Sequence, residues 1–302
     1  MTDEAWQDWT EDDAARSLRR PRPDDDKYAR GVLGVLTGST EYPGAAVLGV
    51  EAAYRTGVGM VRYIGPRALR AAVLLRRPET VTQAGRVQAW LLGSGMDASH
   101  RTFVLSGDLQ HALASGVPAV LDAGGLDLVG THNGPTVITP HARELATLLI
   151  SREIRTTRNA VLGNPAGWAA RAARELGVVV LLKGAVTHIA DPAGRRLRVH
   201  APTHWLATAG TGDVLGGILG ALAATSHELL LADASALSRI AATAAFVHGQ
   251  AGRLASERVD GGPITALDVA EAVPSVIGRL LAASPPEDQA TTSAHPEPGA
   301  AG

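Results

Sequence analysis

The chain has no cysteine among its 302 residues. This absence excludes disulfide bonds and cysteine-ligated metals, and it fits a reducing compartment such as the cytoplasm. An excess of either charge is also lacking, because 28 Lys and Arg face 30 Asp and Glu. The composition therefore gives no reason to expect nucleic acid as a partner. With 45% hydrophobic residues, the chain can bury a substantial core and is not of the disordered class.

Long apolar runs are absent as well. A membrane-spanning helix needs about 18 or more apolar residues, and the longest weakly polar stretch, Val214 to Ala224, is shorter and contains several glycines. The first thirteen residues are acidic and lack the apolar segment of a signal peptide. We therefore expect a cytoplasmic protein that has no membrane span.

The two ends of the chain differ from its middle. Thr10 to Asp13 has the Thr-x-x-acid form of a helix start, which predicts a short helix to about Arg20, where prolines follow. The last nineteen residues are rich in Pro, Ala and Gly without apolar periodicity, which predicts disorder. We expect an N-terminal extension over 1–26, one large domain over 27–283 and a disordered tail over 284–302.

Between the ends, short apolar runs alternate with helical patterns. Runs rich in Val, Ile and Leu are typical of strands buried on both faces. They are Gly31–Leu36, Met60–Ile64, Trp90–Gly93, Ala119–Asp122, Thr136–Thr139 and Val178–Lys183. Helices are predicted at Gly44–Thr56, Thr102–Ser115, His141–Leu149 and Gly167–Leu176, and Gly57, Gly116 and Gly177 follow three of them as helix-ending glycines. This order predicts an α/β protein with a mostly parallel sheet between two helical layers. A hairpin is expected at 188–190 and 196–200, and helices from 212 to about 283.

The strongest local signal is Ala207 to Leu215, in which Gly210 and Gly212 flank a threonine and Asp213 opens an apolar helix. The glycines allow backbone N–H groups to point at an anion, and the helix start adds partial positive charge. Asp213 could then accept a proton from a substrate hydroxyl as phosphate arrives. The alternative is a glycine loop in which Asp213 only caps the helix.

Two of the predicted strands end in charged or polar residues that suit a ligand. Lys183 and Gly184 follow one buried strand, where a lysine suits phosphate, although lysines often emerge there into solvent. His141 and Glu144 follow another strand. His141 could contact substrate and Glu144 could hold Mg²⁺ through water, or both could serve only as the start of a helix.

Small residues mark two further turns, in the segments Gly34–Ala46 and Gly93–Gly95. They let a planar ligand approach the backbone, or they let a helix pack tightly on the sheet. Because four strand ends in one chain carry small or phosphate-suited residues, we favour one shared pocket over four coincidences.

The chain resembles the ADP-dependent NAD(P)H-hydrate dehydratases, a branch of the ribokinase-like superfamily. The resemblance extends from about Lys27 to about Ala283. It rests on Lys27-Tyr28-Ala29-Arg30-Gly31, Gly38-Ser39, Tyr42-Pro43-Gly44-Ala45-Ala46, Gly57-Val58-Gly59-Met60-Val61, Gly93-Ser94-Gly95-Met96, Leu121-Asp122-Ala123, Thr139-Pro140-His141 with Glu144, Leu182-Lys183-Gly184 and Ala207–Leu215. The glycine–aspartate element is shared by many ribokinase-like kinases, whereas the combination is more specific.

This resemblance implies a ribokinase-like α/β/α sandwich and a set of site residues. The hydrated coenzyme is expected near Ala45, Gly95, His141 and Asp213, with Gly210 and Gly212 as the anion hole beside the catalytic Asp213. The nucleotide is expected near Lys183, Gly184, Ala185, Val186, Thr187 and Gly212.

The implied reaction repairs the S form of hydrated NADH or NADPH. ADP phosphorylates the hydroxyl at C6 of the ring, phosphate leaves, and reduced coenzyme, AMP and phosphate are the products. Mg²⁺ is the expected cofactor, ADP the co-substrate and a homotetramer the expected assembly. Many relatives carry an epimerase domain ahead of this unit. About 26 residues precede Lys27 here, which predicts a stand-alone dehydratase that works alongside a separate epimerase.

One departure concerns Gly216-Gly217, where relatives often have a larger residue beside one glycine; we expect it to loosen the helix slightly, since glycine costs about 1 kcal/mol there.

Two alternative functions stay open. A ribokinase-like kinase of a vitamin-type alcohol would use Asp213 in the same way but release a stable phosphate ester. A catalytically silent nucleotide-binding protein would bind nucleotide without turnover.

Overall fold

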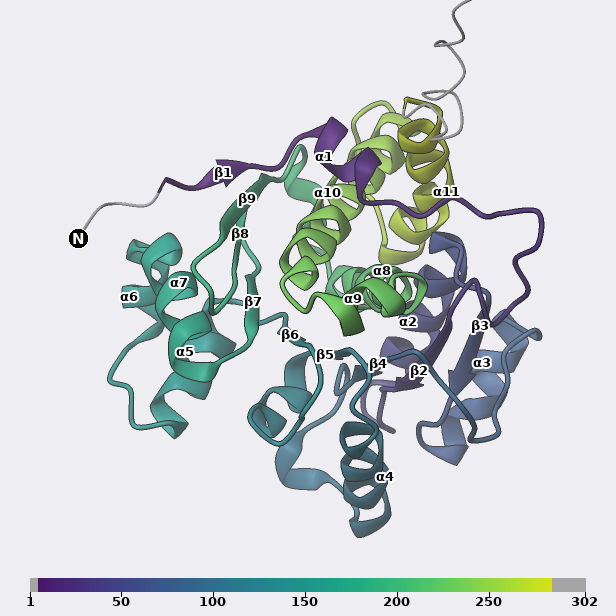
Figure 1. The fold of residues 1–302 in the computed structure, drawn as a ribbon, viewed down its shortest axis with the longest axis horizontal. Coiled ribbons are helices and arrows are strands. Elements are labelled where there is room, and N and C mark those ends of the chain that lie inside the picture. Colours follow the sequence, from purple (N-terminus) through teal and green to yellow (C-terminus); the bar gives the residue numbers. More distant parts are fainter. Residues whose placement is uncertain (1–4, 284–302) are drawn as a thin grey trace, which may run out of the picture.

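Nine strands form one sheet between two helical layers in the computed structural model, which describes residues 5–283 (Figure 1). The sheet order is β1-β9-β8-β7-β6-β5-β4-β2-β3. The strands are β1 Gln7–Asp8, β2 Val32–Leu36, β3 Met60–Tyr63, β4 Ala89–Leu92, β5 Ala119–Leu121, β6 Thr136–Ile138, β7 Val179–Leu182, β8 Val186–Ala190 and β9 Arg196–His200. The predicted disordered tail at 284–302 lies outside the described residues.

Strands β2 to β7 are mutually parallel, and β8 runs antiparallel to both of its neighbours. The predicted mostly parallel sheet and its hairpin are therefore confirmed. Strand β8 begins at Val186 rather than at the expected His188, because its pairing with β9 extends to Val186 opposite His200. The carboxyl ends of these parallel strands therefore lie along one edge of the sheet, and ligands of open α/β sheets bind there.

Helices cover both faces of this sheet (Figure 1). They are α1 Glu11–Arg16, α2 Pro43–Thr56, α3 Arg70–Arg76, α4 Phe103–Ala114, α5 Ala142–Ser151, α6 Arg158–Gly163, α7 Pro165–Leu176, α8 Thr211–Thr225, α9 His227–Ala232, α10 Ala236–Glu257 and α11 Ala266–Ala283. The predicted helix-ending glycines Gly57, Gly116 and Gly177 have φ of 97°, 72° and 66°, the left-handed backbone that ends helices.

Alternate side chains of each strand enter different cores. In β7, Val179 and Leu181 belong to the core that contains α8 and α10, whereas Val180 and Leu182 belong to the core that contains α4, α5 and α7. The alternation follows from the two-residue period of a strand. It explains why these strands are continuously apolar.

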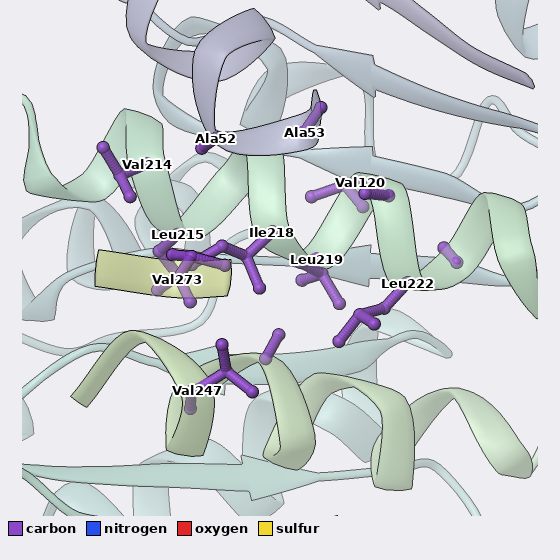
Figure 2. Close-up of a cluster of buried hydrophobic side chains, with 14 of the residues drawn as sticks. Ala52, Ala53, Val120, Val214, Leu215, Ile218, Leu219, Leu222, Val247 and Val273 are labelled. Atoms are coloured by element: carbon purple, nitrogen blue, oxygen red, sulfur yellow. The ribbon is translucent and has the colours of Figure 1, made fainter. Parts of the chain in front are cut away.

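Helix α8 lies in the middle of the first core. Its apolar side chains Val214, Leu215, Ile218, Leu219 and Leu222 point towards neighbours from α2, α10, α11 and the sheet (Figure 2). The core on this helix holds its first turn in a fixed position at the sheet edge, because close-packed interiors allow little displacement.

The adjacent glycines Gly216 and Gly217 of α8 have a packing role that the sequence analysis missed. A Cβ on Gly217 would lie 2.3 Å from the Gly49 carbonyl oxygen and 2.8 Å from the Ala52 Cβ, and one on Gly216 would lie 3.1 Å from Leu91 Cδ1. Gly217 therefore lets α8 lie directly against α2, and Gly216 lets it lie against Leu91 of β4. The slight loosening expected from this glycine pair stays a prediction.

The N-terminal segment joins the sheet as well. Strand β1, which the sequence analysis did not predict, pairs in parallel with β9. Helix α1 starts with the predicted capping box between Thr10 and Asp13 but ends at Arg16, earlier than the expected Arg20. Helices α3 and α6 were also missed. No helix among residues 5–283 is long and apolar enough to cross a membrane.

Candidate active site

Four neighbouring strands, β4 to β7, bring polar side chains together where they end. Asp122 follows β5, is only 3% exposed, and accepts three hydrogen bonds. Ser94 Oγ donates at 3.0 Å, Thr139 Oγ1 at 2.7 Å and Lys183 Nζ at 2.9 Å. These bonds satisfy a carboxylate that burial alone would penalise, so the cluster is a rigid part of the site.

Lys183 carries its charge in this cluster. Its side chain is 22% exposed, and its ammonium lies 2.9 Å from Asp122 and 3.8 Å from Glu144 Oε2. Burial lowers the pKa of Lys183, but the negative charges of Asp122 and Glu144 outweigh it, so the pKa lies above its ordinary value. Burial raises the pKa of Asp122, yet Lys183 and the hydrogen bonds hold it below the ordinary value. Both partners are therefore ionised at neutral pH.

The glycine turn before α8 faces Lys183. Gly210 has a φ of 88°, and a Cβ there would lie 2.6 Å from Leu48 Cδ1, so only glycine fits. Thr211 Oγ1 donates to the carbonyls of Leu206 and Thr208, which fixes the turn. A Cβ on Gly212 would lie 3.6 Å from Lys183 Nζ. The N-terminus of α8 and the lysine thus flank one position suited to a phosphate.

Asp213 lies in the first turn of α8 and is partly buried. Its carboxylate accepts no hydrogen bond within the part of the chain that the structure describes, which argues against a role as helix cap. Burial and the negative charge of Asp122 raise the pKa of Asp213 to about 7, although Lys183 opposes this shift. A base whose pKa lies near the working pH is well matched to proton transfer.

A cavity of about 510 Å³ opens beside the turn and the lysine. Its polar end contains Lys183, Gly184, Thr187 and Gly212, and Ala185 also lines it. Its walls are mostly apolar, formed by Val199, Ala201, Leu206, Leu215 and Ala245. The predicted nucleotide residues therefore meet in one cavity, except that Val186 does not line it. An apolar slot with a cationic end suits a nucleotide.

His141 and Glu144 form a reciprocal capping box at the start of α5. His141 Nδ1 accepts from the Glu144 N–H at 3.1 Å, and Glu144 Oε2 accepts from the His141 N–H at 2.7 Å. Because Nδ1 accepts, the neutral ring carries its proton on Nε2. His141 also lines the cavity, together with the predicted nucleotide residues.

Ala45 and Gly95, both predicted to contact substrate, lie against each other. A Cβ on Gly95 would be 2.4 Å from the Ala45 Cβ and 3.1 Å from the Tyr42 carbonyl oxygen. Neither residue lines the cavity. Gly210 lies against Leu48 of α2, and Gly49 of the same helix lies near the backbone of Asp213. Ala45, near the start of α2, and Gly95 therefore lie outside the cavity that most of the predicted nucleotide residues line.

Several site residues had no assigned role in the sequence analysis. Asp122 was noted only as part of a motif, although a carboxylate that directly follows a buried strand is the same kind of signal as Lys183. Thr203, His204 and His248 line the cavity, and no local pattern marks them. His248 Nε2 is buried without a partner, and burial, the main cause, lowers the pKa of this ring to about 4.

The acidic side chains at this sheet edge bear on how magnesium could be held. Within residues 5–283, no group of three His, Cys, Asp or Glu side chains could hold a metal ion. The Lys183 ammonium, rather than a metal, lies between Asp122 and Glu144. Magnesium often keeps several waters and binds mainly through substrate phosphates. The residues present are therefore compatible with magnesium that is held mainly by nucleotide phosphates, and not with a metal held by protein side chains alone.

A sheet edge that combines a cavity of this size, a glycine turn at a helix start and a carboxylate of raised pKa is typical of α/β proteins that bind nucleotides. Comparison with known proteins makes this class narrower. The chain belongs to the NAD(P)H-hydrate dehydratase family, whose sequence model matches residues 33–275.

Individual relatives agree with this assignment. The chain is 44% identical over 226 residues to the bifunctional NAD(P)H-hydrate repair enzyme Nnr of Mycobacterium tuberculosis, covering 70% of this chain and 45% of that protein. It is 29% identical over 290 residues to the ADP-dependent (S)-NAD(P)H-hydrate dehydratase of Xanthomonas campestris, covering 88% of this chain and 95% of that protein. The chain thus spans about half the length of the bifunctional relatives that it matches.

A solved structure supports the fold. The ADP/ATP-dependent NAD(P)H-hydrate dehydratase of Bacillus subtilis, co-crystallised with ATP and Mg²⁺, superimposes with a TM-score of 0.79 at 25% identity, covering 92% of this chain and 99% of that one. The expected ribokinase-like fold is confirmed.

Proposed function

We propose that the protein is an ADP-dependent dehydratase of the S form of hydrated NADH and NADPH. The net reaction removes water from the damaged coenzyme and cleaves ADP to AMP and phosphate, so atoms balance. The observation that carries the proposal is the position of Asp213, a base with a pKa of about 7 beside an anion-binding turn and a nucleotide-sized cavity.

Each residue then has a task. Lys183 and the N–H groups that follow Gly210 and Gly212 hold the transferring phosphoryl group, where charge develops. Asp213 accepts the proton of the C6 hydroxyl as its oxygen bonds to phosphorus and the bond from phosphorus to AMP breaks. Phosphate then leaves C6 while C5 loses a proton, which restores the double bond of the ring. Ala45 and Gly95 leave room for the coenzyme ring on the α2 side, and His141 offers its Nε2 proton to substrate or phosphate.

Magnesium, when bound with the nucleotide, would neutralise phosphate charge and orient the phosphoryl group. Glu144 is the side chain that we expect to hold one of its waters, since its Oε2 lies 3.8 Å from Lys183 Nζ beside the cavity. The assembly proposed from the family resemblance is a homotetramer that acts in the cytoplasm alongside an epimerase.

A kinase of a small alcohol is the main alternative, and its products distinguish it. Purified protein is incubated with chemically hydrated NADH, Mg²⁺ and either ADP or ATP, while the absorbance of NADH is followed. We expect absorbance to recover together with free phosphate, and faster with ADP. A phosphorylated product that persists, or no recovery with either nucleotide in folded protein, would contradict the proposed function.

A further inference from the structure

Asp122 is the most buried charged group near the site, and the reaction as described does not use it. It does not line the cavity, and three side chains from three other strand ends hold it in place. A carboxylate that is buried and fully bonded costs desolvation energy. Its position therefore calls for an explanation in terms of the groups around it.

The charged and titratable groups around Asp213 suggest why Asp122 is buried in this position. Asp122 and Lys183 act on its charge from the ends of β5 and β7. Glu144 on α5 interacts with Lys183, and His248 on α10 is neutral because burial lowers its pKa to about 4. Asp213 is the only charged residue of α8, and on α11 Asp268 bonds its own helix start at Thr265.

Lys183 is within electrostatic range of three carboxylates, Asp122, Glu144 and Asp213. It bonds Asp122 at 2.9 Å. A lysine bonded to Asp213 instead would stabilise the ionised carboxylate and weaken it as a base. Asp122 prevents this by holding the ammonium on the strand side, where the same cation still faces Gly212 and the phosphate position.

We propose that Asp122 is a positioning residue of the reaction, which anchors Lys183 at the cavity and keeps a fixed negative charge beside the general base Asp213. The inference rests on the proposed function for its kinetic consequence. The effect of Asp122 on the pKa of Asp213, by contrast, involves only the protein's own side chains and can be measured without turnover.

The sign of the effect follows from the charges. Asp122 raises the pKa of Asp213, and Lys183 lowers it. Asp122→Asn removes the raising charge and releases Lys183 towards Asp213, so both changes lower the pKa of the base. If Asp213 must be ionised to act, the acidic limb of the pH–rate profile moves to lower pH by about one unit.

The experiment combines two readouts on the full chain. The carboxyl carbons of ¹³C-labelled aspartates are titrated by NMR, with Asp213→Asn used to assign the Asp213 signal, and pH–rate profiles are recorded with hydrated NADH and ADP. Ser94→Ala is the matched control, because it removes one hydrogen bond to Asp122 but leaves the charge. We expect Asp213 to titrate near 7 in the wild type and in Ser94→Ala, and about one unit lower in Asp122→Asn.

The outcomes separate the two claims. An Asp213 that titrates near 4 in the wild type, or equally in the wild type and Asp122→Asn, would overturn the role of Asp122. A shifted titration without turnover in any sample would leave that role intact and count against the proposed function alone. Should Asp122→Asn fail to fold, Asp122→Ser removes the same charge and leaves room for water in its place.

Discussion

Replacing Asp213 by asparagine should weaken catalysis and strengthen the fold. The substitution keeps the size of the side chain but removes the base, and loss of a general base costs about 10²- to 10⁴-fold in rate. Nucleotide affinity should be kept, since Asp213 does not line the cavity. The stability gain arises because the folded protein holds an Asp213 carboxylate whose ionised form is disfavoured.

The size of the gain follows from the pKa. The folded value is about 7 and the ordinary value 3.8. Between these values the folded protein binds a proton that the unfolded chain has released, so stability falls as pH rises through this window. Three pH units correspond to at most about 4 kcal/mol, and partial exposure reduces this to about 1–3 kcal/mol. The Asp213→Asn variant lacks this carboxyl group, so above pH 7 its free energy of unfolding is not reduced in this way.

Thermal unfolding of both proteins at pH 8 and at pH 4.5 tests this argument. We expect the asparagine variant to melt several degrees higher at pH 8, with a gap that narrows towards pH 4.5. Turnover measured on the same samples should be lost. The reasoning is refuted if the variant is less stable by about 0.5–2 kcal/mol and keeps its turnover, because this is the pattern of a helix cap.

Three other results are expected. Gly217→Ala should destabilise the protein by about 1–3 kcal/mol, despite a better helix propensity, because its Cβ would lie 2.3 Å from a carbonyl oxygen of α2. Gly278→Ala in the exposed, open part of α11 is its control and should stabilise by up to about 1 kcal/mol; equal denaturant midpoints for the two would contradict the packing role. Lys183→Ala should weaken ADP binding by at least tenfold in calorimetry, and unchanged affinity would place the nucleotide elsewhere. Light scattering should give a tetramer at micromolar concentration, and a monomer alone would refute that expectation.

The parallel strands were predictable because each one is buried on both faces and therefore continuously apolar. Lys183 and Asp213 were predictable for a similar reason, since chemistry-bearing residues directly follow a buried strand or open an apolar helix. Strand β1 has two residues, Gln7 and Asp8, which is too short for any periodicity. Helix α3 has seven residues, about two turns, so its apolar face leaves little pattern.

The role of Asp122 could not be read from its local sequence. It depends on three side chains that reach it from other strands, and their convergence is set by the order of strands in the sheet. The far wall of the cavity was missed for the same reason. Ala201 follows β9 and His248 lies in α10, and only the packing of these distant segments makes them neighbours. The packing role of Gly217 likewise needs the position of α2.

The edge pairing of β1 with β9 has a consequence for how the chain folds during synthesis. Asp8 and Arg198 pair across 190 positions of the chain, so β1 has no partner until β9 has been made. At about 5–20 residues per second, this leaves the first strand unpaired for roughly 10–40 s.

The pairing of β1 with β9 is therefore a long-range step of folding, and it comes after the central strands can pair. Trp9 is buried and its backbone N–H donates to the Arg198 carbonyl, and the ring of Trp6 packs edge-on against His188. These two natural fluorophores lie at that junction, so their contribution to the fluorescence, with the three other tryptophans replaced, should report pairing of the first strand.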